Sequence, residues 1–231
     1  MQTSDDPLAI PLWINGHAYL TMAASFFDVR NPKTGAILRR TPLCGPDVAL
    51  KAVAAAQAAL PQWTGQSPAA RAALLAAVGE ALAGYAGHFA QLIVDETGRE
   101  PDLAVAEVSD AVALLRGAAS AADSSGVVAV VSDDTAPLLG PLSRAVPALL
   151  AGATVVVKPS PKAPSPIFAL AELTARNGLP DGVFNVLQGD EAAVEGLSAA
   201  GDVSVLLFAG APALAARVGA IAARNGKSFA A

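Results

Sequence analysis

The sequence predicts an α/β fold in which short β hairpins and a helical segment precede a doubly wound parallel sheet. Two turn signals separate apolar stretches in the first forty residues, and short apolar runs alternate with helical patterns in the second half. Short apolar runs separated by helices are typical of a parallel sheet that is covered on both faces. We expect a single domain over residues 1–231, with the β and helical part at 1–125 and the α/β part at 126–231.

Composition limits the functional classes that the chain can belong to. Hydrophobic residues make up 53% of the 231 residues, and the formal net charge is −5. An acidic chain without a basic cluster argues against nucleic-acid and anionic-membrane partners, which require concentrated positive charge. Cys44 is the single cysteine, so an internal disulfide and a cysteine zinc cluster are excluded. The acidic N-terminus, Met1–Asp6, lacks the positive start of a secretory signal, and we expect a cytoplasmic protein.

The opening residues predict two β turns. Asn15-Gly16 lies between apolar and aromatic residues, and this dipeptide accepts the positive φ angles of a tight hairpin. A second turn is expected at Asn31–Gly35, between the apolar residues at 27–29 and 37–38.

Three helices are expected next. The first begins with Asp47 as its N-cap and ends at Pro61, which cannot continue a helix. Ser67-Pro68 supplies an N-cap and a first-turn proline for the second helix, which extends to about Ala83. After a C-cap at Gly98, the third runs from about Pro101 to Ala122.

The second half of the chain alternates between strands and helices. The expected strands are Val127–Val131, Thr154–Val157, Val183–Leu187, Val203–Phe208 and a short run near Phe229. The expected helices are Leu138–Leu150, Ile167–Arg176, Ala192–Ala199 and Ala213–Arg224. This order is Rossmann-like, and in such sheets ligands bind outside the carboxyl ends of the strands.

Several consecutive motifs of this sequence are similar to the N-terminal part of NAD(P)-dependent aldehyde dehydrogenases, from about Trp13 onward. The motifs are Asp-Glu-Thr-Gly at 95–98, Gly-Val-Val-Ala at 126–129, Val-Val-Val-Lys-Pro-Ser at 155–160, Gly-Leu-Pro-Asp-Gly-Val-Phe-Asn-Val at 178–186 and Phe-Ala-Gly at 208–210. Several motifs in the right order and spacing are far more specific than a lone glycine pattern.

The resemblance implies a cysteine nucleophile and a deacylating glutamate, which the family carries beyond the point that matches Ala231. Cys44 lies in the opening extended region and is expected to be a small buried hydrophobe. Where the family has an oxyanion-binding asparagine, this chain reads Asp133-Asp134-Thr135-Ala136-Pro137. Because the neighbouring carboxylates repel a developing oxyanion, we expect no active oxyanion hole. With the cysteine, the glutamate and the asparagine all unmatched, we expect no catalytic residues in this chain.

The resemblance also implies a site for NAD or NADP, which we expect to bind weakly. The candidate cofactor-binding residues are Ser132, Lys158, Ser160, Gly189, Phe208 and Gly210. Lys158 matches a lysine that binds the adenosine ribose, but Pro161 replaces its glutamate partner. Asp190 and Glu191 place negative charge where a pyrophosphate passes. The alternative interpretation is that the glycines only permit tight turns between strands and helices.

Other polar residues suggest no further site. His17 and His88 have no serine and acid at triad spacing, and we interpret them as surface residues. Asp133-Asp134 is interpreted as a solvated pair, so no metal site is expected. The segment between Ala122 and Gly126 is short for the family's oligomerisation hairpin, which argues against its usual tetramer.

Two functional hypotheses remain open. The first is a non-catalytic assembly or regulatory domain, similar to the inactive aldehyde-dehydrogenase-like domains of some bifunctional proline-utilisation flavoproteins. The alternative is the NAD(P)-binding subunit of a split aldehyde dehydrogenase. For partners, we expect a homodimer or a complex with a full-length or complementary dehydrogenase. The contact is expected along Ala213–Arg224, where Leu214, Val218 and Ile221 form an apolar stripe. The alternative is that this stripe faces the sheet, as every covering helix of a doubly wound fold requires.

Overall fold

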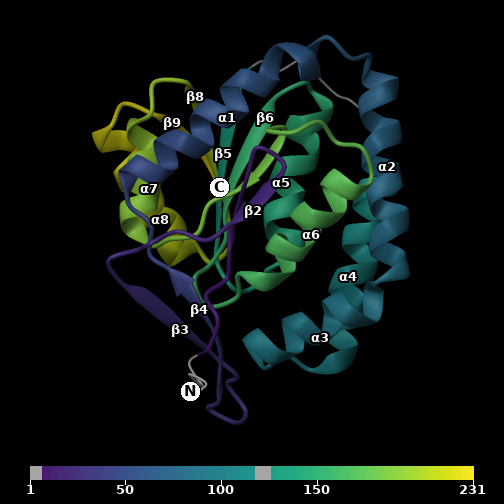
Figure 1. Cartoon of the computed structure of the whole chain (residues 1–231), viewed down its shortest axis with the longest axis vertical. Helices are drawn as coiled ribbons and strands as arrows, with labels where there is room; N and C mark the ends of the chain where they lie inside the picture. The colour runs from purple at the N-terminus through teal and green to yellow at the C-terminus, as the bar shows by residue number, and fades with distance from the viewer. Residues whose placement is uncertain (1–6, 118–125) are drawn as a thin grey trace, which may run out of the picture.

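The computed structural model describes residues 7–117 and 126–231, which form two sheets and eight helices (Figure 1). The helices are α1 (Pro46–Thr64), α2 (Pro68–Gly84), α3 (Ala86–Thr97), α4 (Pro101–Arg116), α5 (Leu139–Leu150), α6 (Ser165–Arg176), α7 (Glu191–Ala199) and α8 (Pro212–Arg224). The strands are β1 (Leu12–Ile14), β2 (His17–Tyr19), β3 (Phe26–Arg30), β4 (Ile37–Pro42), β5 (Val127–Ser132), β6 (Thr154–Lys158), β7 (Phe184–Val186), β8 (Val203–Ala209) and β9 (Ser228–Ala230).

The main sheet confirms the predicted fold class. Its strand order is β2-β1-β7-β6-β5-β8-β9, and β7, β6, β5, β8 and β9 run parallel. The hairpin of β1 and β2 joins this sheet, because β1 pairs antiparallel with β7. Strands β3 and β4 form a separate two-stranded sheet. The short hairpins therefore precede the parallel sheet as predicted, and one of them extends it.

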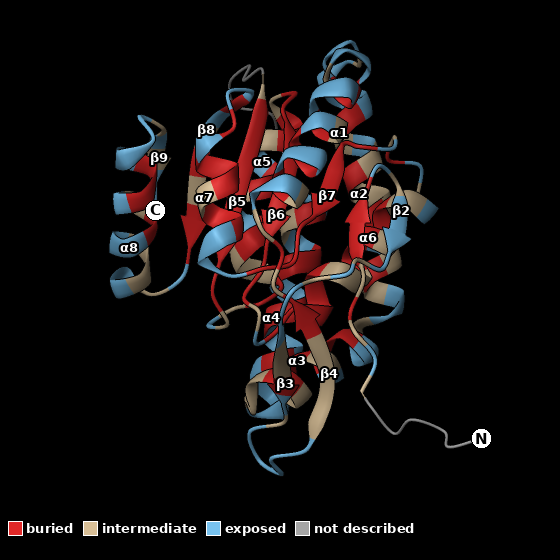
Figure 2. Cartoon of the chain, turned by 60° about the vertical axis from the view of Figure 1, so that its left-hand side comes forward, coloured by how far each residue is buried: buried red, intermediate tan, exposed pale blue. Residues whose placement is uncertain are grey.

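Helices cover both faces of the sheet. Helices α1, α7 and α8 pack on one face, while α5 and α6 pack on the other with α2, α3 and α4 outside them (Figure 1). Alternate residues of β5 enter opposite cores, with Val128 and Val130 on the α5 side and Val127 and Ala129 on the α1 side. The central strands β1, β7, β6 and β5 are buried at every residue, and exposed residues gather on the outer faces of the helices (Figure 2). Burial on both faces explains the continuous apolar runs in the sequence.

Both predicted turns are present. Asn15 and Gly16 adopt φ angles of 54° and 76°, as a two-residue hairpin with two positive φ angles requires. In the turn between β3 and β4, the Asn31 side chain accepts hydrogen bonds from the backbone N–H groups of Lys33 and Thr34 at 2.9 and 3.1 Å. Such an Asx turn closes the loop without a partner from elsewhere in the chain.

The helix caps at Ser67 and Gly98 are confirmed. The Ser67 hydroxyl accepts from the Ala70 N–H at 3.2 Å, and Gly98 ends α3 with a φ of 70°. Two boundaries of α1 were wrong: its N-cap is Gly45, with Asp47 in the first turn, and the helix continues through Pro61 to Thr64.

Pro61 lies inside α1 and does not end it, because a residue of the last turn forms a hydrogen bond to a neighbouring helix. The Trp63 indole N–H donates to the Leu149 carbonyl of α5 at 3.0 Å, and Trp63 is fully buried. This tertiary contact offsets the hydrogen bond that Pro61 cannot make.

Helix α4 ends at Arg116, where the N–H of Gly117 donates to the Ala113 carbonyl at 2.8 Å. The predicted extension to Ala122, and the segment 122–125 that argues against an oligomerisation hairpin, lie outside the described residues. Among the described helices, none is by itself long and apolar enough to span a membrane. The pair α2 and α3 passes a length and composition test only together, across a 74° bend.

Candidate functional site

A groove of about 450 Å³ opens at the carboxyl ends of β5 and β6, between α7 and α8. Its polar lining comes from the strand ends, the loop that follows β6 and the first turn of α7, and its apolar lining comes mainly from the facing sides of α7 and α8. The lining residues are Val131, Ser132, Asp134, Lys158, Ser160, Pro161, Lys162, Asp190, Glu191, Val194, Leu214, Arg217, Val218 and Ile221. The groove lies where ligands bind in doubly wound sheets.

Lys158 ends β6 at the base of this groove. Its ammonium group donates to the carbonyls of Pro159 and Gly189 at 2.8 and 2.9 Å, and the residue is 4% exposed. Burial lowers the pKa of Lys158 from 10.5 to about 8, and the Asp190 carboxylate partly opposes this shift. A lysine has three N–H donors and two are used, which leaves one for a ligand.

Ser132 supplies a hydroxyl group beside Lys158. Ser132 is 2% exposed, and its Oγ has no hydrogen-bond partner among the described residues. A buried hydroxyl without a partner costs free energy unless a ligand or water completes it. Ser160 is also buried, but its hydroxyl donates to Asp134 Oδ1 at 3.2 Å and accepts from the Lys162 N–H at 3.3 Å. Ser132 therefore has the unmet hydrogen-bonding capacity.

The groove is lined by equal numbers of basic and acidic residues. The three basic residues are Lys158, Lys162 and Arg217, and the three acidic residues are Asp134, Asp190 and Glu191. Arg217 of α8 pairs with Glu191 of α7 at 2.7 Å across the groove mouth. The Asp190 carboxylate accepts from the Ala192 N–H at 3.1 Å and caps α7. The expected negative pair at 190–191 is thus partly neutralised by contacts that the sequence alone did not reveal.

Three of the six predicted cofactor-binding residues line the groove together: Ser132, Lys158 and Ser160. Phe208 is instead a core residue of β8, 1% exposed. Gly189 is not among the lining residues, although its carbonyl holds Lys158. A Cβ at Gly189 would lie 2.6 Å from that of Ala193, so close packing alone requires glycine there.

Gly210 has a similar structural explanation. Its φ is 150°, and a Cβ there would lie 2.3 Å from Cγ of Asp133. The Asp133 carboxylate accepts from the Ala211 N–H at 2.6 Å, at the start of α8. Gly210 therefore lets a carboxylate approach the N-terminus of this helix.

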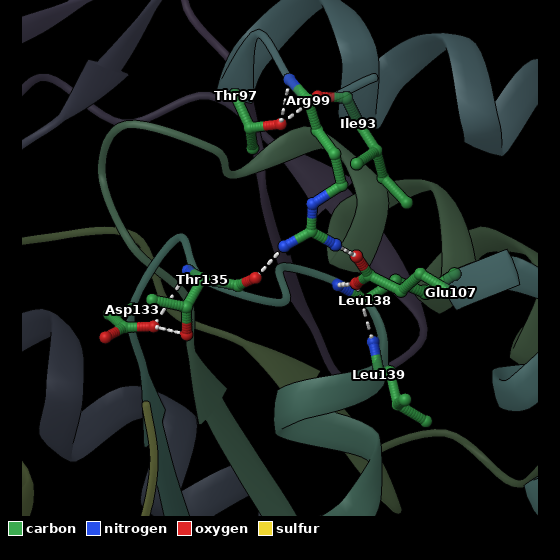
Figure 3. Close-up of polar contacts among 8 residues, drawn as sticks. All are labelled: Ile93, Thr97, Arg99, Glu107, Asp133, Thr135, Leu138 and Leu139. Atoms are coloured by element: carbon green, nitrogen blue, oxygen red, sulfur yellow. Dashed lines mark hydrogen bonds and ion pairs between the residues drawn. The ribbon is translucent and has the colours of Figure 1, made fainter. Parts of the chain in front are cut away.

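Asp133 also holds the loop that follows β5 (Figure 3). Its Oδ1 accepts from the N–H and the hydroxyl of Thr135 at 2.9 and 2.5 Å. With 7% exposure, Asp133 is buried, so the expectation of a solvated Asp133-Asp134 pair was wrong for Asp133. The reason is a backbone donor 78 residues away in the sequence, which sequence spacing does not show. No group of three or more His, Cys, Asp or Glu side chains suited to a metal ion occurs within residues 7–117 and 126–231.

A second carboxylate supports the same loop from α4 (Figure 3). Glu107 accepts from the N–H groups of Leu138 and Leu139 at 2.9 and 3.1 Å, and so caps the N-terminus of α5. Arg99 contacts both the Glu107 carboxylate and the Thr135 carbonyl. The loop at 133–138 is therefore fixed from two sides.

The remaining predicted positions lie outside the groove. Cys44 is buried, which agrees with its interpretation as a small hydrophobe, and burial raises the pKa of its thiol to about 11. His17 and His88 are exposed, as expected.

The apolar stripe of α8 faces inward. Val218 and Ile221 are each 3% exposed and belong to the core on the α1 face, and Leu214 packs against that core. These three side chains also line the groove, so the stripe packs within the chain, which is the alternative that the sequence left open, and the predicted docking through α8 concerns the other face of the helix. Together with Val194 they are the apolar walls that the sequence analysis missed. The signal was present in the stripe, but the sequence does not show that the stripe faces α7.

The parallel sheet, its helices on both faces and the groove at its carboxyl edge define a Rossmann-like α/β domain. A sequence model of the aldehyde dehydrogenase family matches residues 19–125 and 123–231. The chain belongs to the aldehyde dehydrogenase family.

Individual relatives agree with this assignment. The malonate-semialdehyde dehydrogenase of Pseudomonas aeruginosa is 31% identical over 221 residues, which cover 87% of this chain and 44% of that protein. The lactaldehyde dehydrogenase of Escherichia coli is 28% identical and matches 95% of this chain and 50% of its own length. A crystal structure of Escherichia coli lactaldehyde dehydrogenase superposes with a TM-score of 0.87 over 96% of this chain and 51% of that chain. The chain thus spans about half the length of these relatives.

At least two structural neighbours were solved with a cofactor. The indole-3-acetaldehyde dehydrogenase of P. syringae, in complex with NAD+ and IAA, superposes with a TM-score of 0.86 at 25% identity over 97% of this chain and 50% of that chain.

The lowered pKa of Lys158 predicts a pH dependence of stability. Between pH 8 and 10.5 the unfolded chain binds more protons at this residue than the folded chain, so the free energy of unfolding rises with pH. We expect Lys158→Met to lack this contribution. Urea unfolding of both proteins at the two pH values measures it, and the Cys44 thiol titrates in both and cancels. An identical pH dependence in the two proteins would contradict the prediction.

Proposed function

We propose that this chain is an NAD(P)-binding portion of an aldehyde dehydrogenase family protein and that it holds the adenosine part of the cofactor in the groove between α7 and α8. The observation that carries this proposal is the buried Ser132 hydroxyl, which has no partner among the described residues and lies in the groove beside Lys158. Val194, Val218 and Ile221 provide apolar surface for a purine ring.

The polar and apolar parts of the groove fit a nucleoside in different ways. Lys158 and Ser132 offer donors for ribose hydroxyls at the strand ends, and α7 and α8 enclose the base. When bound, such a cofactor supplies the hydride acceptor of an aldehyde oxidation. The protein's part is to position the cofactor, with the buried ammonium of Lys158 fixed by two backbone carbonyls.

We also propose that the chain by itself does not oxidise aldehydes. Thr135 takes the place that the resemblance gives to the family's oxyanion asparagine, two residues before Pro137, and its hydroxyl already donates to Asp133 at 2.5 Å. The single cysteine of the sequence is buried, and its raised pKa keeps it a thiol at neutral pH. The described residues therefore support cofactor binding better than covalent catalysis.

Removing the Ser132 hydroxyl tests the cofactor site. We expect Ser132→Ala to weaken binding of NAD+ and adenosine about three- to tenfold, since a hydrogen bond contributes roughly 0.5–1.5 kcal/mol. The ligand-free variant should be at least as stable as the native protein, because an unpaired buried hydroxyl is removed. Calorimetric titration and thermal unfolding measure the two effects.

Ser204→Ala is the matched control, because its hydroxyl donates to the Val127 carbonyl at the amino end of β5, away from the groove. It should lose stability and keep its affinity. Equal ligand affinities of native protein and Ser132→Ala would refute the proposed site.

The absence of turnover is tested with purified chain, NAD(P)+ and short-chain aldehydes. We expect no cofactor reduction above the protein-free rate at neutral pH. Turnover that persists in Cys44→Ala and is lost in Lys158→Met would show an active site in this chain and contradict the proposal.

For its partner, we propose that the chain associates with a second copy or with a complementary dehydrogenase through the outward face of α8. Ala213, Ala216, Ala220 and Ala223 are exposed there, so another helix can approach closely. Arg217 and Arg224 beside them pair with glutamates of α7.

A charge on this face tests the contact. We expect Ala216→Glu and Ala220→Glu to reduce the mass measured by light scattering to that of a monomer, since a buried unpaired carboxylate opposes association. The matched control is Ala70→Glu, which adds the same charge at an exposed position of α2 and should leave the mass unchanged. Unchanged mass in folded α8 variants would place the contact elsewhere.

A further inference from the structure

The groove lies beside the N-termini of the two helices that form its walls. Helices α7 and α8 begin near the carboxyl ends of the parallel strands. In doubly wound folds, nucleotide phosphates rest on free N–H groups at such helix starts, where the helix dipole also favours negative charge. The state of these N–H groups therefore decides whether phosphates add to binding.

At α8 one donor of the helix start, the N–H of the N-cap residue, is already used by the chain itself. The Ala211 N–H donates to Asp133 Oδ2 at 2.6 Å, and the next residue, Pro212, has no N–H. Two further hydrogen bonds from Thr135 fix the other carboxylate oxygen, and Asp133 is buried. A carboxylate thus stands where a ligand anion would be bound.

This arrangement depends on Gly210. Any side chain at that position would collide with the Asp133 carboxyl group, whose Cγ would lie 2.3 Å from the added Cβ. A glycine that leaves room for a phosphate in a nucleotide-binding loop here leaves room for an internal carboxylate.

The N-terminus of α7 shows the same feature. Asp190 caps it through the Ala192 N–H at 3.1 Å, and Asp190 and Asp134 both line the groove. Phosphates that enter the groove thus meet Asp190 at the start of α7 and Asp134 after β5. Asp133, which is not itself a lining residue, lies between the lining residues Ser132 and Asp134 and holds the start of α8.

We propose that Asp133 is a specificity-determining residue that serves as the chain's own anion at the N-terminus of α8, so that the groove selects nucleosides over their di- and pyrophosphates. This inference rests on the proposed function, since it takes the groove as an adenosine site. If the groove selects in this way, the affinity for NAD or NADP comes from the adenosine part of the dinucleotide and not from its pyrophosphate.

Calorimetric titration with adenosine, ADP and inorganic pyrophosphate tests the inference. We expect the native protein to bind ADP no more tightly than adenosine. Asp133→Asn keeps the shape and an acceptor for Ala211 but removes the charge, so affinity for ADP should rise at least tenfold and pyrophosphate should bind, with adenosine unchanged within twofold. Asp202→Asn, an exposed acid before β8, is the matched control and should leave all three affinities unchanged.

The outcomes separate the two proposals. Native protein that binds ADP at least tenfold more tightly than adenosine, or an Asp133→Asn variant with no gain for ADP or pyrophosphate, overturns the role of Asp133 while leaving the adenosine site in place. Failure of adenosine to bind native protein, with pyrophosphate gained by Asp133→Asn, overturns the adenosine site and supports the anion role. If Asp133→Asn does not fold, Asp133→Ser replaces it, and the native ADP-to-adenosine ratio decides the matter without any variant.

Discussion

The N–H groups at the start of a helix lack partners within the helix, and at each helix that follows a strand of the α/β part a carboxylate of the chain itself accepts from at least one of them. Glu107 caps α5, and Glu96 accepts from the Ser165 N–H at the start of α6 at 3.0 Å. Asp190 caps α7, and Asp133 accepts from the Ala211 N–H just before α8. Free N–H groups at a buried helix end are costly, and a carboxylate is their strongest ordinary acceptor. Because Glu96 and Glu107 come from α3 and α4, the helical segment completes the helices that cover the sheet.

Helix α5 shows how closely the two parts depend on each other. Its N-terminus is capped by Glu107, and its last carbonyls accept from Trp63 of α1 and Arg71 of α2, the latter from Nε to Leu150 at 2.9 Å. Both ends of the central covering helix are therefore satisfied by groups from the first part of the chain. Removing one partner from such a buried polar contact costs more than the contact contributes when complete, since the remaining group stays desolvated.

The sequence predicted the features that depend on residues close together in the chain. Local backbone geometry is specified by Asn15-Gly16, Asn31, Ser67 and Gly98, and the apolar runs specify strands that are buried on both faces. Three of the four carboxylate caps join residues 31, 69 and 78 positions apart, and only the Asp190 cap of α7 is local. No periodicity or motif in the sequence identifies residues that pair over such distances. The continuation of α1 through Pro61 could not be predicted for the same reason, because it depends on the contact between Trp63 and α5. The candidate site was half predicted for the same reason: motif residues at the strand ends were found, but the walls from α7 and α8 were not.

The structure also changes which residues argue for a ligand. Gly189 and Gly210 match the family's pattern, yet a side chain at either position would collide with Ala193 or Asp133, so packing within the chain accounts for both. Ser132 is one of the six candidates that the sequence named, and its buried hydroxyl is left without a hydrogen-bond partner among the described residues. An unmet buried donor at the carboxyl edge of the sheet points to a ligand more directly than a retained glycine does. One unpaired hydroxyl group and the two apolar helix faces beside it are thus the features of the groove that favour the proposed nucleoside.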